Sequence, residues 1–196
     1  MMTLREFRSR LSSDAGISMA ELLIYCLLLG GVMTMVGSLL INSLRTQDTV
    51  TSVVDATTAA QLGARSVEQG IRNSSTFKLT TVNTSDQLLL ARVSKSDGSW
   101  TCQAWYYSNA NDSLRFTQST SIIPATAWST TGLANWTLLV EGVKPPASAA
   151  ATAPIFATSG ASVTINFRVD AGDNPNATIS SSASRRLSQG STQCFT

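Results

Sequence analysis

Few side chains in this sequence have the chemistry that catalysis requires. The 196 residues include no histidine, which removes the commonest general base, the commonest zinc ligand and every triad that depends on an imidazole. Three cysteines cannot form a four-thiolate metal site. Carboxylates such as Glu141 and Asp170 remain, but no pattern in the sequence pairs them. We therefore expect a protein that is not an enzyme and that carries no cofactor.

Oxygen ligands gather in one short segment, residues 170–176. Asp170, Asp173, Asn174 and Asn176 carry carboxylate or amide oxygens, which are the atoms that calcium prefers. Their spacing is not that of an EF-hand loop. Aspartate and asparagine also favour tight turns, in which their side chains bond to nearby backbone groups. A turn is the expected structure, and a calcium site is the alternative.

Aromatic side chains form a second candidate binding feature. An exposed cluster of them could stack on carbohydrate or adhere to a partner, whereas core packing is the expected role of at least half. These side chains are Trp100, Trp105, Tyr106, Tyr107, Trp128 and Trp136.

The charge of the chain argues against direct binding of nucleic acid. Lys and Arg number 14 against 12 Asp and Glu, the formal net charge is +2, and charged residues make up only 13% of the chain. Such a composition lacks the concentrated basic patch that replaces counterions on a phosphate backbone. We expect no nucleic-acid partner.

The strongest pattern lies near the N-terminus. Residues 1–16 are polar and carry Arg5, Arg8 and Arg10, and residues 22–44 contain no charged side chain. As a helix, this uncharged stretch would be about 34 Å long at about 1.5 Å per residue, enough to cross a bilayer. Because the arginines precede the stretch, we expect a single span with a cytoplasmic N-terminus and an exported remainder.

Ordinary targeting signals can contain such a stretch. A cleaved secretory signal has a shorter apolar core followed by a small-x-small site, and no good site of that kind follows this run. A lipoprotein signal needs small residues before the modified cysteine, whereas Tyr25 precedes Cys26. Cys26 is therefore expected to be an apolar side chain of the span, with a lipidation site as the alternative. An uncleaved signal anchor fits the hydropathy alone and remains open.

The residues at the edge of the span form a more specific pattern. Gly16 precedes the apolar Ile17, and Glu21 follows four positions later. A carboxylate beside a long apolar run is costly and commonly marks a function. With the basic leader and the span, this pattern resembles the type IV prepilin signal. The resemblance implies that a membrane prepilin peptidase cuts between Gly16 and Ile17 and methylates the new amino group of Ile17.

The resemblance also gives Glu21 a role in assembly. It implies that this carboxylate pairs with the N-terminal amine of a neighbouring subunit, so that subunits join head to tail in a helical filament. The alternatives are a carboxylate that reaches the headgroups or that pairs with its own amine. Ile17 in place of the usual Phe, and a span without proline, indicate a minor subunit. Gly30, Gly31 and Gly37 are then candidate points of local helix weakness.

A second helical pattern follows the span. Over residues 42–73, apolar side chains recur every three or four positions, which is typical of an amphipathic helix with a thin apolar face. The face comprises Val50, Val53 or Val54, Thr57, Ala60, Ala64, Val67 and Ile71. We expect it to pack on a sheet of the same chain, with a coiled coil as the alternative. The end of this helix also resembles that of PilW-like minor pilins and J-type minor pseudopilins.

The remainder of the chain has the pattern of β-strands separated by polar turns. We expect an antiparallel meander whose apolar face is covered by the helix, with the proline-bounded segment 144–154 as a surface loop. The predicted strands are 76–82, 86–94, 100–108, 113–118, 136–143, 162–170 and 177–184. The expected fold class is therefore α+β, and the resemblance implies that it is pilin-like. Its expected parts are a leader (1–16), a transmembrane or filament-core helix (17–44), an amphipathic helix (45–75) and a β-rich head (76–196).

Two cysteines, Cys102 and Cys194, fall in the part that we expect to be exported, where thiols are generally oxidised. A bond between them would close a loop of about 90 residues and would stabilise the head by about 4–5 kcal/mol at most. It would also resemble the disulfide-bounded C-terminal region of many pilins. Two free buried cysteines are the alternative.

These patterns indicate a structural minor subunit of a bacterial type IV pilus. The expected partners are other pilin subunits, prepilin peptidase and the inner-membrane assembly platform. The expected location is the bacterial cytoplasmic membrane, crossed once with the N-terminus inside, and then the pilus or cell surface. A minor pseudopilin of a type II secretion system shares every one of these motifs. A signal-anchored surface binding domain is the alternative from another class.

Overall fold

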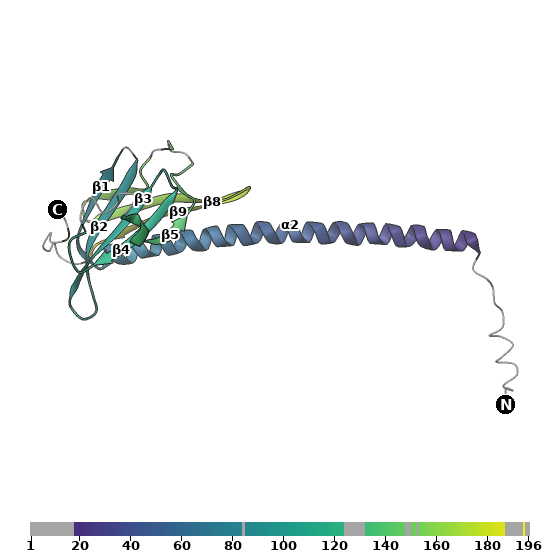
Figure 1. The fold of residues 1–196 in the computed structure, drawn as a ribbon, viewed down its shortest axis with the longest axis horizontal. Coiled ribbons are helices and arrows are strands. Elements are labelled where there is room, and N and C mark those ends of the chain that lie inside the picture. Colours follow the sequence, from purple (N-terminus) through teal and green to yellow (C-terminus); the bar gives the residue numbers. More distant parts are fainter. Residues whose placement is uncertain are drawn as a thin grey trace, which may run out of the picture. The chain divides into compact units, whose positions relative to one another are not determined.

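The computed structural model describes residues 18–83, 85–123, 132–147, 150–151, 153–186 and 194. One long helix, α2 (Met19–Arg72), precedes a series of antiparallel strands (Figure 1). This arrangement confirms the predicted α+β layout. The expected leader and the expected cleavage site at Gly16 and Ile17 lie outside the described residues. The chain divides into two compact units, Met1–Asp48 and Thr49–Thr196, and α2 contributes to both.

Helix α2 is continuous over 54 residues, which is about 81 Å at about 1.5 Å per residue. Its first turn is closed by the carbonyl of Ser18, which accepts hydrogen bonds from the backbone N–H of Glu21 (2.8 Å) and of Leu22 (3.1 Å). Glu21 in the first turn and Arg72 in the last turn carry the charges that the helix dipole favours at each end. The helix contains no proline and continues through its glycines, so the expected weak points do not interrupt it.

Five strands form an antiparallel meander that follows the helix directly, in the order β1-β2-β3-β4-β5. They are β1 (Ser74–Val82), β2 (Asp86–Ser94), β3 (Trp100–Ser108), β4 (Ser113–Ser119) and β5 (Thr137–Glu141). A short 3-10 helix, η1 (Leu133–Asn135), precedes β5. The first four predicted strands are correct to within two residues.

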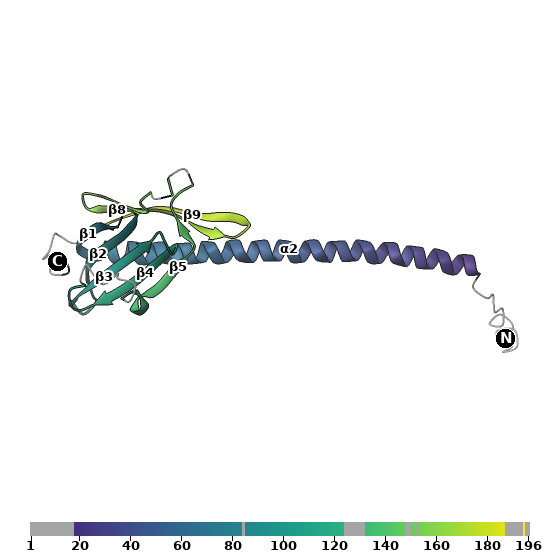
Figure 2. The same ribbon diagram turned by 45° about the horizontal axis from the view of Figure 1, so that its top comes forward.

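The remaining strands form a second sheet, whereas the sequence predicted a single meander. They are β6 (Val143–Lys144), β7 (Phe156–Ser159), β8 (Ser162–Ala171) and β9 (Asn174–Ser184). Strand β8 is central: it pairs with β9 along one edge and with β6 and β7 along the other. Figure 2 shows β8 and β9 as a long hairpin apart from β3, β4 and β5.

The predicted strand 136–143 is present as two strands rather than one. Gly142 has a φ of +71°, a conformation that glycine adopts without strain, and it divides the segment into β5 of the first sheet and β6 of the second. The backbone N–H of Val143 donates to the carbonyl of Asp112 (2.8 Å), and the N–H of Asp170 donates to the carbonyl of Gly142 (2.9 Å). Residue 144, predicted to start a loop, belongs to β6.

The main hydrophobic core is shared by the C-terminal part of α2 and by both sheets. The helix contributes a face of small residues, namely Ala56, Ala60, Gly63, Ala64, Val67, Gly70 and Ile71. Much of the predicted face is therefore correct, but Val50 is 54% exposed and does not belong to it. Gly63 and Gly70 were not predicted, because glycine carries no hydropathy signal.

The close approach of α2 to the first sheet explains the glycines at positions 63 and 70. A β-carbon added to Gly63 would lie 2.5 Å from Cγ2 of Val140 on β5, and one added to Gly70 would overlap the indole ring of Trp105 on β3. The Trp105 indole N–H also donates to Oγ of Ser66 on the helix (3.0 Å). The glycines thus allow the helix to approach the sheet closely enough to bury Trp105 completely.

Gln87 connects the two sheets from a buried position on β2. Its side-chain oxygen accepts hydrogen bonds from the backbone N–H of Ile155 (2.8 Å) and of Phe156 (2.9 Å), and its side-chain nitrogen donates to the carbonyl of Phe156 (2.9 Å). These bonds satisfy a polar group that would otherwise be costly to bury. They also fix the short strand β7 beside the first sheet.

Candidate functional site

The N-terminal half of α2 exposes its apolar side chains. These side chains have no apolar partners among the described residues of their own compact unit. Its most apolar 18-residue window has a mean hydropathy of 2.1, and none of that window is buried. It is the one helix in the described part of the chain that is long and apolar enough to cross a membrane. We call residues 22–44 the exposed apolar segment. Its large side chains, such as Leu27 (76% exposed) and Leu39 (69% exposed), project on all sides.

Two hydroxyl groups within the exposed apolar segment are satisfied by the helix itself. The Thr34 hydroxyl donates to the carbonyl of Gly31, and the Ser38 hydroxyl donates to the carbonyl of Met35, each at 2.8 Å. Such bonds to the preceding turn remove the need for water as a partner. The segment can therefore enter an environment without water, whether lipid or a packed bundle of other helices.

Glu21 lies at the N-terminal border of this segment and is exposed. Its Oε1 accepts a hydrogen bond from the Tyr25 hydroxyl (3.0 Å), one turn along the helix. Glu21 was predicted from the sequence and Tyr25 was not, although the four-residue spacing that brings the two side chains together is visible in the sequence. Among the described residues no cation bonds to Glu21, so its charge remains available to an external partner.

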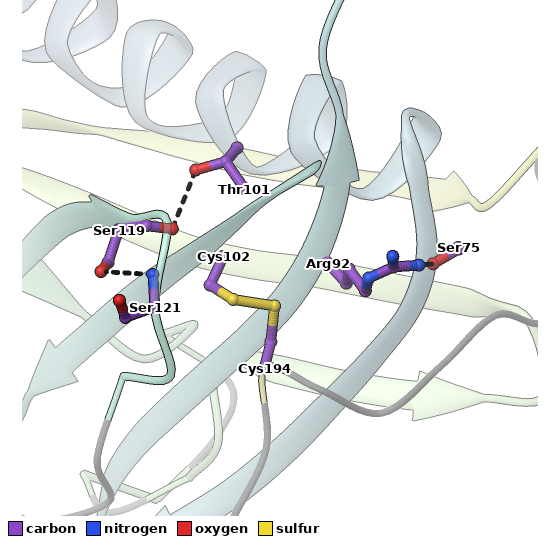
Figure 3. Close-up of a disulfide and its surroundings, with 7 residues drawn as sticks. All are labelled: Ser75, Arg92, Thr101, Cys102, Ser119, Ser121 and Cys194. Carbon is purple, nitrogen blue, oxygen red and sulfur yellow. Dashed lines mark hydrogen bonds between the residues drawn. A yellow bond between two sulfur atoms is a disulfide. The ribbon is translucent and has the colours of Figure 1, made fainter. Parts of the chain in front are cut away.

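The structure contains a disulfide between Cys102 and Cys194, which were the expected pair (Figure 3). The two Cα atoms are 5.5 Å apart, and 92 positions separate the residues in sequence. Both cysteines belong to a second hydrophobic cluster, on the face of the first sheet opposite α2, with Tyr106 and Trp136. The bond therefore ties residue 194 to the middle of the meander. Cys26 is a free, exposed cysteine of α2.

Four of the five candidate aromatic side chains in the described ranges are buried and form no exposed binding patch. Trp105 and Tyr107 are fully buried under α2, and Tyr106 and Trp136 are 3% and 6% exposed on the other face of the first sheet. Trp100 is the exception at 36% exposed, with the Arg92 guanidinium 3.9 Å from its ring centroid. Trp128 lies outside the described residues. The stacking hypothesis is therefore wrong for four of the six side chains.

The oxygen-rich segment 170–176 forms the turn of a β-hairpin. Asp170 Oδ1 accepts a hydrogen bond from the N–H of Gly172 (3.0 Å), whose φ is +69°, and Asp170 Oδ2 accepts one from Lys144 Nζ (2.9 Å). These bonds hold the pKa of Asp170 below its usual range, and the same pairing raises the pKa of Lys144. Asn174 donates to Ser52 Oγ of α2 (2.7 Å). The expected turn is thus present.

These positions offer no cluster of metal-binding side chains. Within the described ranges, no three His, Cys, Asp or Glu residues are grouped closely enough to hold a metal ion. Of the two carboxylates considered for catalysis, Asp170 is bonded to Lys144, and Glu141 ends β5 as an exposed residue. The contacts of Asp170 are those of a structural residue.

Comparison of the chain with protein-family models, with curated proteins and with solved structures gives no match.

Proposed function

We propose that this chain is a minor subunit of a bacterial type IV pilus, trimmed between Gly16 and Ile17 and assembled through α2. The observation that carries the proposal is a single helix with two different surfaces. Its first half exposes a long apolar segment bordered by Glu21, and its second half is packed into a disulfide-linked β head. The prepilin-like sequence around Gly16 supports the same function.

The apolar segment supplies the driving force for assembly in this proposal. Burying one leucine or isoleucine side chain contributes about 1.5–3 kcal/mol relative to exposure in water. The segment carries many such side chains that are more than half exposed. In the membrane, lipid covers them. When a subunit leaves the membrane, the helices of neighbouring subunits must replace the lipid.

In this proposal, Glu21 determines the direction and the register in which neighbouring subunits join. Cleavage before Ile17 creates an ammonium group next to apolar side chains, where an unpaired charge is expensive. The Glu21 carboxylate of a neighbouring subunit neutralises it, and the Tyr25 hydroxyl holds that carboxylate in position. Each subunit therefore offers one carboxylate and one amine at different heights, which gives a head-to-tail contact that repeats along a filament.

Glu21 variants test this proposal. We expect Glu21→Ala and Glu21→Gln to reduce the amount of the chain in sheared filaments by about tenfold or more, because each loses the charge that pairs with the amine. Glu141→Gln is the matched control, since it removes an exposed carboxylate from the head. Membrane insertion and the thermal unfolding of the head should be unchanged in all three variants.

Two other functions predict different results. A minor pseudopilin of a type II secretion system would also depend on Glu21, but loss of the chain would then impair export of secreted proteins and leave surface pili intact. A signal-anchored surface binding domain would remain in the membrane with its leader intact, and Glu21→Ala would have no effect on its location.

A further inference from the structure

A groove of about 600 Å³ runs along one flank of the head, between α2 and the first sheet. The residues of its walls that matter here are Leu62, Arg65 and Gln69 on α2, Gln103 on β3, and Phe116 and Gln118 on β4. At the C-terminal end of α2 the groove continues into a second hollow of about 430 Å³, because Asn73, Ser94 and Lys95 line both. We call the two together the cationic groove.

The charge of this groove has one sign. The residues that line its two parts include Arg65, Arg72, Lys95 and Arg186 and no Asp or Glu. Arg72 is paired with Glu68 (3.0 Å). Asp97 is the other nearby acid, and its hydrogen bonds with Ser99, with a smaller contribution from the charge of Lys95, hold its pKa below the usual range.

Three of these cations have side chains without a hydrogen bond or ion pair in the described part of the head. Most other cations of the described head have partners: Arg92 and Arg185 bond to Ser75, Arg115 bonds to Trp136, and Lys144 bonds to Asp170. In contrast, the side chains of Arg65, Lys95 and Arg186 make no hydrogen bond or ion pair with any residue that the structure describes. Unengaged cations are thus concentrated in the groove.

The other groove side chains are of two kinds. Gln69, Asn73, Gln103 and Gln118 carry amides that offer donors and acceptors together, and these side chains are also without hydrogen-bond partners among the described residues. Leu62 is 59% exposed and Phe116 is half-buried, so they add an apolar surface, here called the apolar strip, to the groove.

We propose that the cationic groove binds an acidic oligosaccharide, a chain of sugar rings that carry carboxylate or sulfate groups. The guanidinium and ammonium groups can pair with the anionic substituents. The amides can form hydrogen bonds with the hydroxyl groups, and the apolar strip can pack against the faces of the rings. Single-stranded nucleic acid fits less well, because it needs exposed aromatic side chains for successive bases and more phosphate contacts than three free cations provide. The inference is independent of the pilus proposal.

Binding of defined probes to the full chain in detergent micelles tests the inference. The probes are fluorescent hexamers of oligogalacturonate and of heparin-derived oligosaccharide, with maltohexaose as the neutral control and a dT12 oligonucleotide as the competing polyanion. We expect at least one acidic hexamer to bind about tenfold more tightly than maltohexaose. Its affinity should fall between about 50 and 300 mM salt, because charge pairs at an open surface are screened.

Three double variants locate the site. Arg65→Gln with Lys95→Gln should weaken binding of the acidic hexamer by about tenfold, whereas Arg168→Gln with Arg45→Gln, which removes the same charge outside the groove, should leave it unchanged. Gln103→Leu with Gln118→Leu should also weaken binding, although it changes no charge. Thermal unfolding checks that each variant is folded.

Three results would overturn the inference. One is that neither acidic hexamer binds more tightly than maltohexaose. Another is that the control double variant weakens binding as much as the groove variant does. The third is that dT12 binds as tightly as the acidic hexamers and depends on the same two cations, which would make the groove a nucleic-acid site.

Discussion

The two halves of α2 use their apolar side chains in opposite ways. The N-terminal half contains the larger apolar side chains and leaves them exposed, from Met19 at 88% to Ile41 at 53%. The C-terminal half contains alanine and glycine on its inner face and buries them, with Ala60 at 0%. The more apolar half is therefore the one whose side chains have no partner among the described residues of their own compact unit. We infer that its partner is lipid or other helices, whereas the second half already has its partner in the head.

Loss of the disulfide should have the largest effect on the stability of the head. It should not affect the N-terminal half of α2. We expect Cys102→Ser or Cys194→Ser to lower the free energy of unfolding of the head by about 2–4 kcal/mol, because the bond restricts a long loop in the unfolded chain. Thermal unfolding of the full chain in micelles, followed by near-ultraviolet circular dichroism, measures the loss. Cys26→Ser is the control. Equal stability of all three variants would show that the bond does not hold the head together.

Glycine substitutions compare the two halves directly. Gly70→Ala should destabilise the head by about 1–3 kcal/mol, because its β-carbon would overlap the Trp105 ring. Gly30→Ala meets nothing within 4 Å and should leave the head unchanged while it favours the helix by about 1 kcal/mol. Head unfolding and far-ultraviolet helicity provide the two measurements. If Gly70→Ala destabilised the head no more than Gly30→Ala does, the close packing of α2 against Trp105 would be contradicted.

The sequence predicted the elements of the head better than their assembly. Strands such as 86–94 and 100–108 were correct because each is a local run between polar turns. The division at Gly142 was missed because it depends on β6 pairing with Val169 of β8, far along the chain. Strand β7 was missed for the same reason: it is only four residues long, and its start is fixed by bonds to Gln87.

Features of the candidate site that depend on residue type and spacing could be predicted from the sequence. Features that depend on how the helix packs on the sheet could not. Glu21 and the Cys102–Cys194 pair could be identified from residue type and position. The burial of Trp105 could not, because it depends on which helix residue faces β3, and that residue is a glycine. Tyr25 could have been found from its four-residue spacing to Glu21.

Alkaline pH should lower the free energy of unfolding of the head by less than the disulfide and glycine substitutions do. Burial, with lesser contributions from Asp112 and Asp86, raises the pKa of Tyr107 to about 12, and burial together with the hydrogen bond to Asp86 raises the pKa of Tyr106 as well. The unfolded tyrosines ionise near pH 10. The stabilisation is therefore complete below about pH 10 and decreases as the pH rises towards 12.

Denaturant midpoints at about pH 9 and 11 measure this decrease. Tyr107→Phe should reduce the decrease, because phenylalanine cannot ionise. An unchanged midpoint in the natural chain between these two values would contradict the burial of both tyrosines.

The smallest effect is expected at the exposed ion pair of the second sheet. Lys144 and Asp170 are 37% and 38% exposed, and pairs of that kind contribute less than about 1 kcal/mol. Lys144→Ala should therefore lower the unfolding temperature of the head by only about 2–4 °C or less, and added salt should reduce the difference. A larger loss would mean that this pair, rather than the buried face of α2, holds the second sheet in place.

The most direct test of the proposed function is the intact mass of the natural protein isolated from cells that contain an active prepilin peptidase. We predict a chain that begins at Ile17 and carries one additional methyl group on its terminal amine. The same species should occur in membranes and in sheared filaments. A chain that still carries residues 1–16 would contradict the account, because the exposed half of α2 would then be a permanent membrane anchor.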